Sequence, residues 1–500
     1  MATIAIDVRR QIGGIDPKIY GGFIEHLGRC IYGGICDEGS RLSDARGFRK
    51  DVMAAVKRLA VRILRWPGGN FASGYHWMDG IGPKDQRPRR MELAWHTVES
   101  NRFGTDEFVE YCRMIGAEPF ICVNMGNGTM DEAQAWVEYC NGKKDSYYAE
   151  LRRRNGHPEP YNVEYWGLGN EVSGEWQIGH KDAATYADLA LEFAKVMKWV
   201  DPSIQLVACG SCQMTSAEME WNRIVVERLI DIAEYLSIHM YVNNRADEYY
   251  EYMGASAWIE RYIRAVRGII DGATYHSRQG KSMKIAFDEW NTTFSFGHEH
   301  PNHERYTLED ALVVAMFLNA FLRHAEVVKI ANMAQLVNVI SPITTSGDDL
   351  FLQTIFFPVE LYASQNGTVS LDAYVECGTF ETRKYGPVPY IDVSASYDPG
   401  DGGISINIVN RHRTETIQVG IENQHGRVGR EGVLFEINGE DIKAVNSLEE
   451  KENVKTVRRS IPIPGDSFVV EVPPHSVSMV QAKVGEGIGS HERGVFGDCG

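Results

Sequence analysis

Two glutamates in the sequence stand where acid–base chemistry is expected. Residues 163–170 form an aromatic and apolar run that ends at Glu171, and residues 284–288 form a second β-prone run that ends at Glu289. Parallel α/β enzymes place catalytic groups just past the C-terminal ends of buried strands. Cleaving a glycosidic bond needs one carboxyl to protonate the leaving oxygen and another to act as nucleophile or base. The pair therefore predicts glycoside hydrolysis, although the residues alone do not assign the two roles.

Composition narrows the class of protein. The chain has 500 residues with 43% hydrophobic and 10% aromatic content, enough for a large core and more than one domain. Its 51 basic and 68 acidic side chains give a net charge of -17. This excess of acid disfavours nucleic acid and anionic membranes as partners and suits an enzyme with a neutral ligand, such as carbohydrate.

The N-terminus and the cysteines indicate a cytoplasmic location. The first ten residues alternate apolar and polar side chains without the continuous apolar region of a signal peptide, and no later run reaches membrane-spanning length. The 9 cysteines are odd in number and irregular in spacing, which argues against a secreted disulfide framework. We expect reduced thiols.

An alternation of strand-like and helix-like segments fills the first two thirds of the chain. Between residues 183 and 200, apolar side chains recur at three- and four-residue steps, which predicts a helix that ends before Pro202. Strands are predicted over residues 19–28, 61–70, 118–125, 163–170, 204–210, 235–241, 284–290 and 331–338. Eight such units predict a (β/α)₈ TIM barrel over residues 16–345.

The pattern changes after the predicted barrel. Short alternating runs such as residues 404–409 recur between turns rich in Gly, Pro and Asp, which is typical of an antiparallel β-sandwich. We therefore assign residues 346–485 to a C-terminal β-sandwich domain. Residues 1–15 contain an alternating strand that is expected to join this sandwich, and residues 486–500 are expected to form a flexible tail.

Several motifs in register resemble glycoside hydrolase family 51, the α-L-arabinofuranosidases. They are Gly-Gly-Phe-Ile-Glu-His at 21–26, Arg-Trp-Pro-Gly-Gly-Asn-Phe at 65–71, Gly-Leu-Gly-Asn-Glu at 167–171, His-Met-Tyr at 239–241 and Asp-Glu-Trp at 288–290. The resemblance covers nearly the whole chain. It implies a retaining, exo-acting enzyme that releases terminal α-L-arabinofuranosyl units by double displacement. It also implies that Glu171 is the general acid/base and Glu289 the nucleophile.

The resemblance extends to the residues around the sugar. It implies that Arg65 and His239 support the nucleophile, and that Trp95 forms an aromatic wall. The side chains implied to hold the furanose hydroxyls are Glu25, Asn70, Asn170, Tyr241 and Gln335. All of these polar residues fall near predicted strand ends, where polar groups that merely cap a barrel rim also occur. The resemblance further implies a homo-oligomer, often a hexamer.

Two geometric and electrostatic expectations follow for the glutamate pair. A retaining enzyme holds its two carboxyl groups about 5–5.5 Å apart, whereas a wider gap leaves room for an inverting water. The acid must carry a proton, so we expect burial and the neighbouring Glu289 to raise the pKa of Glu171. The amide of Asn170 is placed to donate to the sugar 2-hydroxyl, a contact that strengthens in the transition state.

Other motif-like segments favour no competing chemistry. His298, His300 and His303 offer three metal ligands, but no regular element sets their spacing, and catalysis by two carboxylates requires neither a metal nor a cofactor. Cys209 and Cys212 have the spacing of a redox motif without the remaining features of a thioredoxin-like unit.

Three functional hypotheses are compatible with the sequence. The first is the arabinofuranosidase, acting on arabinan, arabinoxylan or arabino-oligosaccharides. The second is a related glycosidase, such as an endoglucanase or a β-xylosidase, because barrel loops decide the substrate. The third is a carbohydrate-binding protein with an inactive site, which the presence of both Glu171 and Glu289 disfavours.

Overall fold

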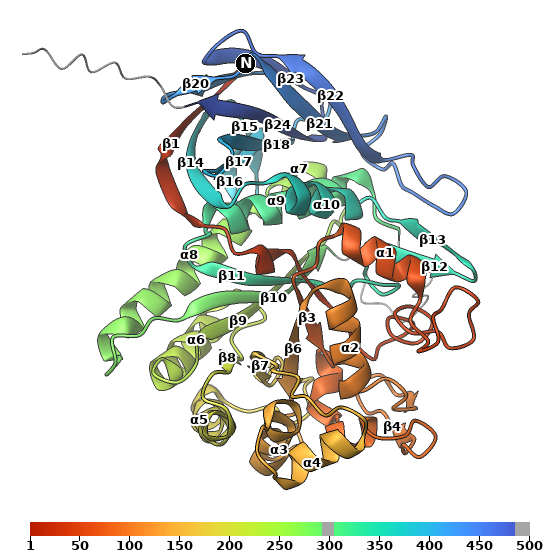
Figure 1. Cartoon of the computed structure of the whole chain (residues 1–500). Helices are drawn as coiled ribbons and strands as arrows, with labels where there is room; N and C mark the ends of the chain where they lie inside the picture. The colour runs from red at the N-terminus through yellow and green to blue at the C-terminus, as the bar shows by residue number, and fades with distance from the viewer. Residues whose placement is uncertain (293–304, 486–500) are drawn as a thin grey trace, which may run out of the picture.

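The computed structural model describes residues 1–292 and 305–485 (Figure 1). Within them, parallel strands close into a barrel in the order β10-β11-β2-β3-β6-β7-β8-β9. Their bounds are β2 (Gly21–Phe23), β3 (Ile63–Trp66), β6 (Glu118–Val123), β7 (Tyr165–Leu168), β8 (Gln205–Ala208), β9 (Tyr235–Val242), β10 (Lys284–Thr292) and β11 (Val328–Ala334). The predicted (β/α)₈ barrel is confirmed, with each strand inside or overlapping its predicted segment.

Helices surround the barrel (Figure 1). The helix predicted before Pro202 is α5 (Ala183–Val200), which begins where the Asp182 side chain accepts a hydrogen bond from the backbone N–H of Thr185. The other helices are α1 (Lys50–Arg58), α2 (Thr105–Ile115), α3 (Met130–Asn141), α4 (Tyr147–Arg154), α6 (Ser216–Leu229), α7 (Tyr249–Met253), α8 (Ala255–Ala273), α9 (Leu308–Arg323) and α10 (Phe356–Gln365).

The barrel interior is closed by a layer of apolar side chains. Six of the barrel strands, β3, β6, β7, β8, β10 and β11, each contribute one buried residue to this layer, which comprises Ile63, Phe120, Tyr165, Val207, Ala286 and Ile330. Strand β2 is short and glycine-rich because its neighbours approach closely: a Cβ on Gly22 would lie 2.5 Å from Leu336 Cδ1. Polar side chains are thereby left to the carboxyl ends of the strands, where the candidate site lies.

The C-terminal strands form one continuous sheet, in the order β22-β21-β24-β18-β17-β14-β1-β19-β23 with β20 beside β24. The first strand, β1 (Ala2–Gly14), pairs antiparallel with β14 and parallel with β19. The other bounds are β14 (Val369–Glu376), β17 (Ile391–Asp398), β18 (Gly403–Asn410), β19 (Ile417–Asn423), β20 (Arg427–Val428), β21 (Glu431–Asn438), β22 (Lys455–Pro462), β23 (Ser467–Val472) and β24 (Ser476–Gly485). The antiparallel C-terminal module is confirmed, and its strands share one hydrogen-bonded order.

This sheet encloses its own apolar core and is joined to the barrel by α9. Side chains from both ends of the strand order, including Phe468 on β23 and Leu434 on β21, belong to one buried cluster, so the sheet curls over itself. Residues 308–322 of α9 are all buried, because the helix packs between β10 and the strands β14, β17, β18 and β24. Arg323 on α9 pairs with Asp392 on β17 at 2.9 Å.

Smaller elements lie in the connections. The hairpin of β12 (Ile343–Ser346) and β13 (Asp349–Leu352) precedes α10, so the sheet begins later than residue 346. The remaining short elements are η1 (Pro17–Tyr20), η2 (Asn70–Gly74), η3 (Trp77–Gly80), η4 (Thr274–His276), β4 (Arg90–Met91), β5 (Val98–Glu99), β15 (Thr379–Thr382) and β16 (Gly386–Pro389). None of the helices in the described part of the chain combines the length and the apolar character that a membrane span requires.

Candidate active site

Glu289 lies within β10 at the carboxyl end of the barrel and is buried. Its pairing partner across the sheet is His239 on β9, after an irregularity in the register that follows Ala286. Arg65 Nη1 donates to Glu289 Oε2 at 2.9 Å, and Tyr241 Oη donates to Glu289 Oε1 at 2.8 Å. Both oxygens therefore accept hydrogen bonds, which fixes the orientation of the carboxylate.

Glu171 follows β7 in a sharp turn. Its backbone φ is 44°, in the left-handed region that residues other than glycine rarely adopt. Glu171 Oε1 lies 2.9 Å from His239 Nδ1, and Trp176 Nε1 donates to Glu171 Oε2 at 3.1 Å. A strained backbone held in place by two side-chain contacts is a feature of functional sites.

The two glutamates and His239 form one compact cluster. One carboxylate oxygen of Glu171, one of Glu289 and one ring nitrogen of His239 all lie within 4.8 Å of one another. His239 Nδ1 is also 3.6 Å from Glu289 Oε2, so the imidazole contacts both carboxylates. Such a group could in principle hold a metal ion. Here Arg65 and Tyr241 already occupy the oxygens of Glu289, so hydrogen bonding accounts for the arrangement.

The hydrogen bonds around His239 indicate an imidazolium. Ser237 Oγ donates to Asp288 Oδ1 at 2.5 Å, so it can only accept from His239 Nε2, 3.1 Å away. Nδ1 faces the carboxylate of Glu171, so both ring nitrogens face acceptors. Burial lowers the pKa of His239, but Glu289, Asp288 and Glu171 outweigh it and raise this pKa to about 10.

The expectation of a raised pKa for Glu171 is wrong for the free enzyme. Burial does raise it, but the hydrogen bond and charge of His239, together with the bond from Trp176, hold the pKa of Glu171 below its ordinary value. The positive charges of His239 and Arg65, which the sequence-based expectation did not include, determine that the pKa of Glu171 falls. Glu171 and His239 consequently share one proton, which resides mainly on His239 in the unliganded site.

Arg65 and Asp288 complete the charged cluster. Arg65 Nε lies 3.3 Å from Asp288 Oδ2, and Arg65 Nη2 donates to Asn170 Oδ1 at 2.6 Å. Burial raises the pKa of Asp288, but Arg65 and His239 outweigh it and lower this pKa. The cluster of Arg65, Glu171, His239, Asp288 and Glu289, which we call the charged wall, thus pairs buried charges with one another, as charges in a barrel interior require.

The side-chain amide of Asn170 has one end free. Its oxygen accepts from Arg65, whereas its Nδ2 is buried and has no hydrogen-bond partner among the described residues. A Cβ placed on Gly69 would lie 3.6 Å from this Nδ2 and 3.5 Å from Glu289 Oε2, so the two atoms border the same space. An unpaired donor beside the carboxylate is suited to a ligand hydroxyl.

A second wall of the site is built around Glu25, which follows β2. Its Oε1 accepts from the backbone N–H of Phe71 and from Trp95 Nε1, both at 3.1 Å, and its Oε2 accepts from Gln335 Nε2 at 2.9 Å. Burial raises the pKa of Glu25 to about 8, so this carboxyl is neutral at pH 7. We call Glu25, Phe71, Trp95 and Gln335 the neutral wall.

The remaining predicted residues border the same space. Asn70 is half-buried at the start of η2, between Gly69 and Phe71, whose neighbours are Glu289 and Glu25 respectively. Tyr241 on β9 contacts Glu289 directly. The structure therefore brings together nine of the proposed side chains, and Asn70 adjoins them in the chain. The nine are Glu25, Arg65, Trp95, Asn170, Glu171, His239, Tyr241, Glu289 and Gln335.

Three residues of the site were missed by the sequence reasoning. Asp288 was seen only as a neighbour of Glu289, although its pairing with Arg65 and Ser237 orients His239. Trp176 reaches Glu171 from a loop and is 54% exposed. An aromatic five residues past a candidate acid could have indicated Trp176, but the role of Ser237 depends on contacts between strands that no local pattern reveals.

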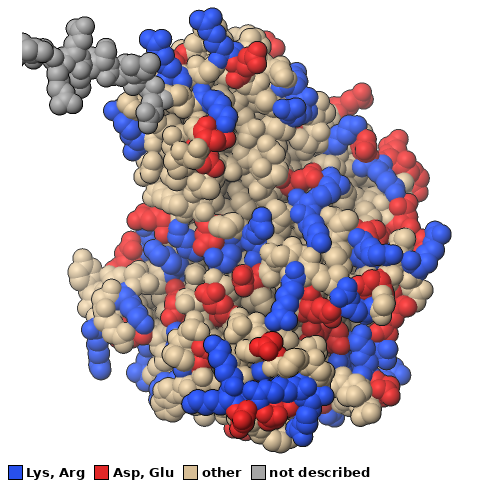
Figure 2. All heavy atoms as spheres, in the orientation of Figure 1, with Lys and Arg blue, Asp and Glu red and all other residues tan. Residues whose placement is uncertain are grey.

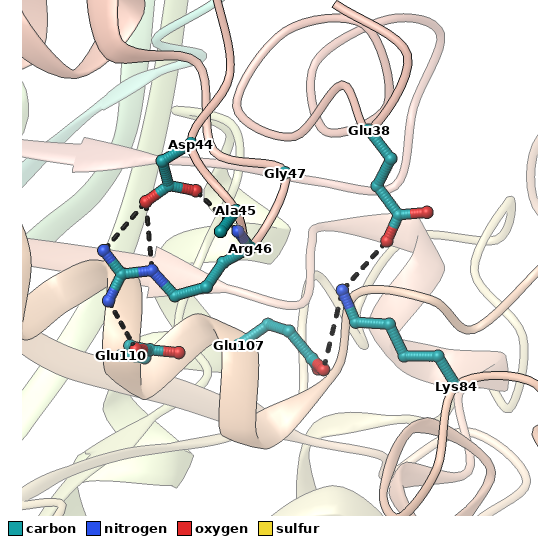
Figure 3. A pocket seen from close by; sticks show the side chains of 8 residues that line it. All are labelled: Glu38, Asp44, Ala45, Arg46, Gly47, Lys84, Glu107 and Glu110. Atoms are coloured by element: carbon teal, nitrogen blue, oxygen red, sulfur yellow. Dashed lines mark hydrogen bonds and ion pairs between the residues drawn. The ribbon is translucent and has the colours of Figure 1, made fainter.

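Other candidate sites carry less chemistry. The hollow in Figure 3, about 430 Å³, is lined by charges that satisfy one another: Lys84 lies 3.0 Å from Glu38, and Arg46 lies 2.7 Å from Glu110. Burial raises the pKa of Cys209 and of Cys212, so both remain thiols. The histidines 298, 300 and 303 lie outside the described residues.

Comparisons with known proteins agree with this geometry. Residues 55–257 match a family model described as alpha-L-arabinofuranosidase 1 domain, and residues 288–476 match one described as alpha-L-arabinofuranosidase C-terminal domain. The chain is 41% identical over 470 residues to a probable alpha-L-arabinofuranosidase C of Aspergillus clavatus, covering 90% of this chain and 92% of the relative.

Two bacterial proteins are equally similar. An intracellular exo-alpha-(1->5)-L-arabinofuranosidase of Halalkalibacterium halodurans is 41% identical over 466 residues, which cover 90% of this chain and 93% of the relative. The solved structure of the thermostable GH51 alpha-L-arabinofuranosidase from Thermotoga petrophila is 41% identical, with a TM-score of 0.89 over 96% of this chain and 100% of that one.

Proposed function

The chain belongs to the α-L-arabinofuranosidases of glycoside hydrolase family 51, and from this premise we propose that it is an exo-acting, retaining enzyme. Its reaction is the release of terminal α-L-arabinofuranosyl units from arabinan, arabinoxylan or arabino-oligosaccharides. The observation that carries the proposal is the close approach of Glu171 and Glu289, whose oxygens lie within 4.8 Å. This separation falls well short of the roughly 6.5–9.5 Å that an inverting pair needs to hold its attacking water, which favours a retaining mechanism.

In the first step, Glu289 attacks the anomeric carbon of the sugar. Arg65 and Tyr241 hold its carboxylate, and a new C–O bond forms as the glycosidic bond breaks. The leaving oxygen takes a proton from Glu171. That proton is supplied through the hydrogen bond between His239 Nδ1 and Glu171 Oε1, so departure of the leaving group moves the proton out of the shared pair.

In the second step, the covalent arabinosyl-enzyme is hydrolysed. Glu171 is now an ionised carboxylate next to the neutral imidazole of His239, and it removes a proton from an incoming water, which restores the shared proton of the pair. The water oxygen bonds to the anomeric carbon, and the bond to Glu289 breaks. Two displacements at one carbon return the original anomeric configuration.

Sugar recognition is assigned to the polar side chains around the pair. Asn170 Nδ2 donates to the hydroxyl next to the anomeric centre, which uses the unpaired nitrogen of that amide. Glu25, Asn70 and Gln335 hold the outer hydroxyls, and Trp95 covers an apolar face of the ring. Because Glu25 is neutral at pH 7, it can both donate to and accept from a hydroxyl.

Location and assembly are further parts of the proposal. All eight described cysteines are free, and one relative at 41% identity is named as intracellular, which supports a cytoplasmic enzyme that receives imported oligosaccharides. A homo-oligomer, with a hexamer as the expected form, stays a prediction that light scattering of the purified chain can test.

The proposal is tested by product analysis. The purified chain should hydrolyse 4-nitrophenyl α-L-arabinofuranoside, and a proton NMR time course should show the α-anomer of arabinose before mutarotation. First appearance of the β-anomer would contradict the retaining mechanism. Release of oligosaccharides from linear arabinan, rather than of arabinose alone, would contradict the exo mode.

A further inference from the structure

A cavity of about 620 Å³ opens beside the charged wall. His239 and Tyr241, which contact the catalytic carboxylates, belong to its lining. Its lining also includes Arg383 and Tyr385, which come from the C-terminal sheet domain rather than from the barrel. Volumes of roughly 300–1,000 Å³ accommodate compact organic ligands, a class that includes di- and trisaccharides.

The C-terminal side of this cavity is one turn that is fastened to the barrel. The turn joins β15 and β16, and Phe380 on β15 packs against Tyr250 of α7 with ring centroids 4.9 Å apart. Arg383 forms an ion pair with Glu248, and its backbone N–H donates to Glu251. These contacts hold the turn against α7, the helix that follows β9 in the chain.

The lining has the chemistry of a site for a neutral, polyhydroxylated ligand. Trp258 and Tyr385 are half-buried and meet edge to face, with ring centroids 5.8 Å apart and an interplanar angle of 65°, so they offer apolar ring faces. Asn243 and Gln213 add exposed amides. The charged residues of the lining have both signs, because Arg245, Arg383 and Lys384 stand with Glu248 and Glu251, and Arg383 is paired with Glu248, so the lining does not present a single sign of charge.

The position of the cavity relates it to the leaving group. Its barrel residues follow β8 and β9, the strands that come after β7 in the barrel, and β7 leads to Glu171. In the proposed function Glu171 protonates the leaving oxygen, so the part of the substrate beyond the scissile bond emerges on this side. The neutral wall of Glu25 lies after β2, on the other side of the pair.

We propose that this cavity is an acceptor-side binding site for the second and third sugar units of a linear α-(1→5)-linked arabino-oligosaccharide, with the β15–β16 turn of the C-terminal domain as its distal wall. The inference rests on the proposed function, and it gives the C-terminal domain a part in substrate choice. Tyr385 supplies a ring face to the distal sugar, and Arg383 with the exposed amides contacts its hydroxyls.

The test compares kcat/KM for α-(1→5)-linked arabinotriose with kcat/KM for 4-nitrophenyl α-L-arabinofuranoside. In Tyr385→Ala, the ratio of the two values should fall roughly three- to tenfold, the scale of one lost aromatic contact. Tyr385→Phe should retain the wild-type ratio because the ring face remains. Tyr374→Ala, which removes a 60% exposed tyrosine on β14 outside the cavity, is the matched control and should leave both values unchanged.

Binding to an inactive enzyme separates recognition from turnover. In a Glu289→Ala background, calorimetry should show that arabinotriose binds more tightly than arabinobiose, and that Tyr385→Ala removes this difference. Equal affinities in the parent variant, or a ratio that Tyr385→Ala leaves unchanged, would overturn the acceptor site while the proposed function stands. Failure of the wild-type chain to hydrolyse the nitrophenyl substrate would instead overturn the proposed function.

Discussion

The charged wall and the neutral wall both contain a buried glutamate, but the neighbours of the two carboxyl groups differ. Cationic side chains contact the one in the charged wall, and neutral donors contact the one in the neutral wall. Glu289 accepts from the guanidinium of Arg65 and lies 3.6 Å from His239. Glu25 accepts its hydrogen bonds from neutral donors, namely a backbone amide, an indole and a side-chain amide, and burial raises its pKa to about 8. Burial raises the pKa of Glu25 because its direct donors are neutral, whereas Arg65 and His239 lie against the carboxylate of Glu289.

This contrast separates the two tasks of a glycosidase. Bond exchange needs an ionised nucleophile and a mobile proton, which the charged wall supplies through Glu289 and the pair of Glu171 and His239. Recognition of a neutral sugar needs donors and acceptors without net charge, which the neutral wall supplies.

The largest effect is expected for Glu289→Ala. Removing the proposed nucleophile should lower kcat on every arabinofuranoside by about five orders of magnitude, the scale seen when a nucleophile that acts within a unit is deleted. Stopped assays with long incubation measure the residual rate, and circular dichroism checks the fold. Turnover above about one per cent of the wild-type rate would remove Glu289 from the role of nucleophile.

The next effect concerns the shared proton. His239→Asn should lower kcat/KM by about 10²–10³-fold, because Glu171 loses its proton source and its partner. The pKa of His239, about 10, keeps the proton in the pair below that pH. Without the imidazole, only Glu171 can retain the proton, so the alkaline limb of the pH profile should move to lower pH. An alkaline limb at the wild-type position would contradict the shared-proton assignment.

A smaller effect is expected at the edge of the charged wall. Trp176→Phe removes the hydrogen bond from Nε1 to Glu171 Oε2 while keeping an aromatic ring. The bond is partly solvated, so the loss in kcat/KM on oligosaccharides should be up to about tenfold. Trp199→Phe on α5, where the tryptophan is 77% exposed, serves as the matched control. An equal loss of kcat/KM in Trp176→Phe and Trp199→Phe would show that the hydrogen bond to Glu171 does not contribute to catalysis.

The smallest effect on activity is expected in the neutral wall. Glu25→Gln mimics a protonated carboxyl, so kcat/KM at pH 6 should fall less than about tenfold. The folded-state pKa of Glu25 is raised from 4.5 to about 8, so the native state holds a proton that the unfolded chain releases. The contribution of this carboxyl to the stability of the wild-type fold is therefore lost as pH rises from about 4.5 to 8.

The matching stability measurement is urea unfolding at pH 5 and pH 9. Relative to wild type, Glu25→Gln should be more stable at pH 9 than at pH 5 by about 1–3 kcal/mol. Glu99→Gln is the control of opposite sign, because hydrogen bonds and charge from His26 outweigh burial and lower the pKa of Glu99 to about 2. Ionised Glu99 stabilises the fold above its unfolded pKa, so its loss should matter more at pH 7 than at pH 3. The same pH trend in both variants would contradict the contrast between the two carboxyls.

The sequence predicted the barrel and most of the site because both depend on local patterns. Alternating βα periodicity defines the strands, and polar residues that follow β2, β3 and β7 or end β9 and β10 must converge at one face. The parallel pairing of β1 with β19 and the single continuous strand order were not predicted, because strand partners far apart in sequence leave no local signal.

Electrostatics was the least predictable part of the site. The pKa of Glu171 was expected to rise because burial and Glu289 were considered, whereas the distance of 2.9 Å to His239 Nδ1 reverses the result. That distance depends on how β7 and β9 lie on either side of β8, with Asp288 and Ser237 fixing the imidazole. Spacing along the chain cannot supply such a contact.

The assignment of Glu171 and Glu289 is tested most directly by azide rescue. With an aryl arabinofuranoside, Glu171→Ala should still form the covalent intermediate, since a good leaving group needs little protonation, but should hydrolyse it slowly for want of a base. Azide needs no base, so it should restore turnover in Glu171→Ala and release α-L-arabinofuranosyl azide, identified by NMR. Rescue of Glu289→Ala to that same α-azide, with none for Glu171→Ala, would contradict the account and exchange the two roles.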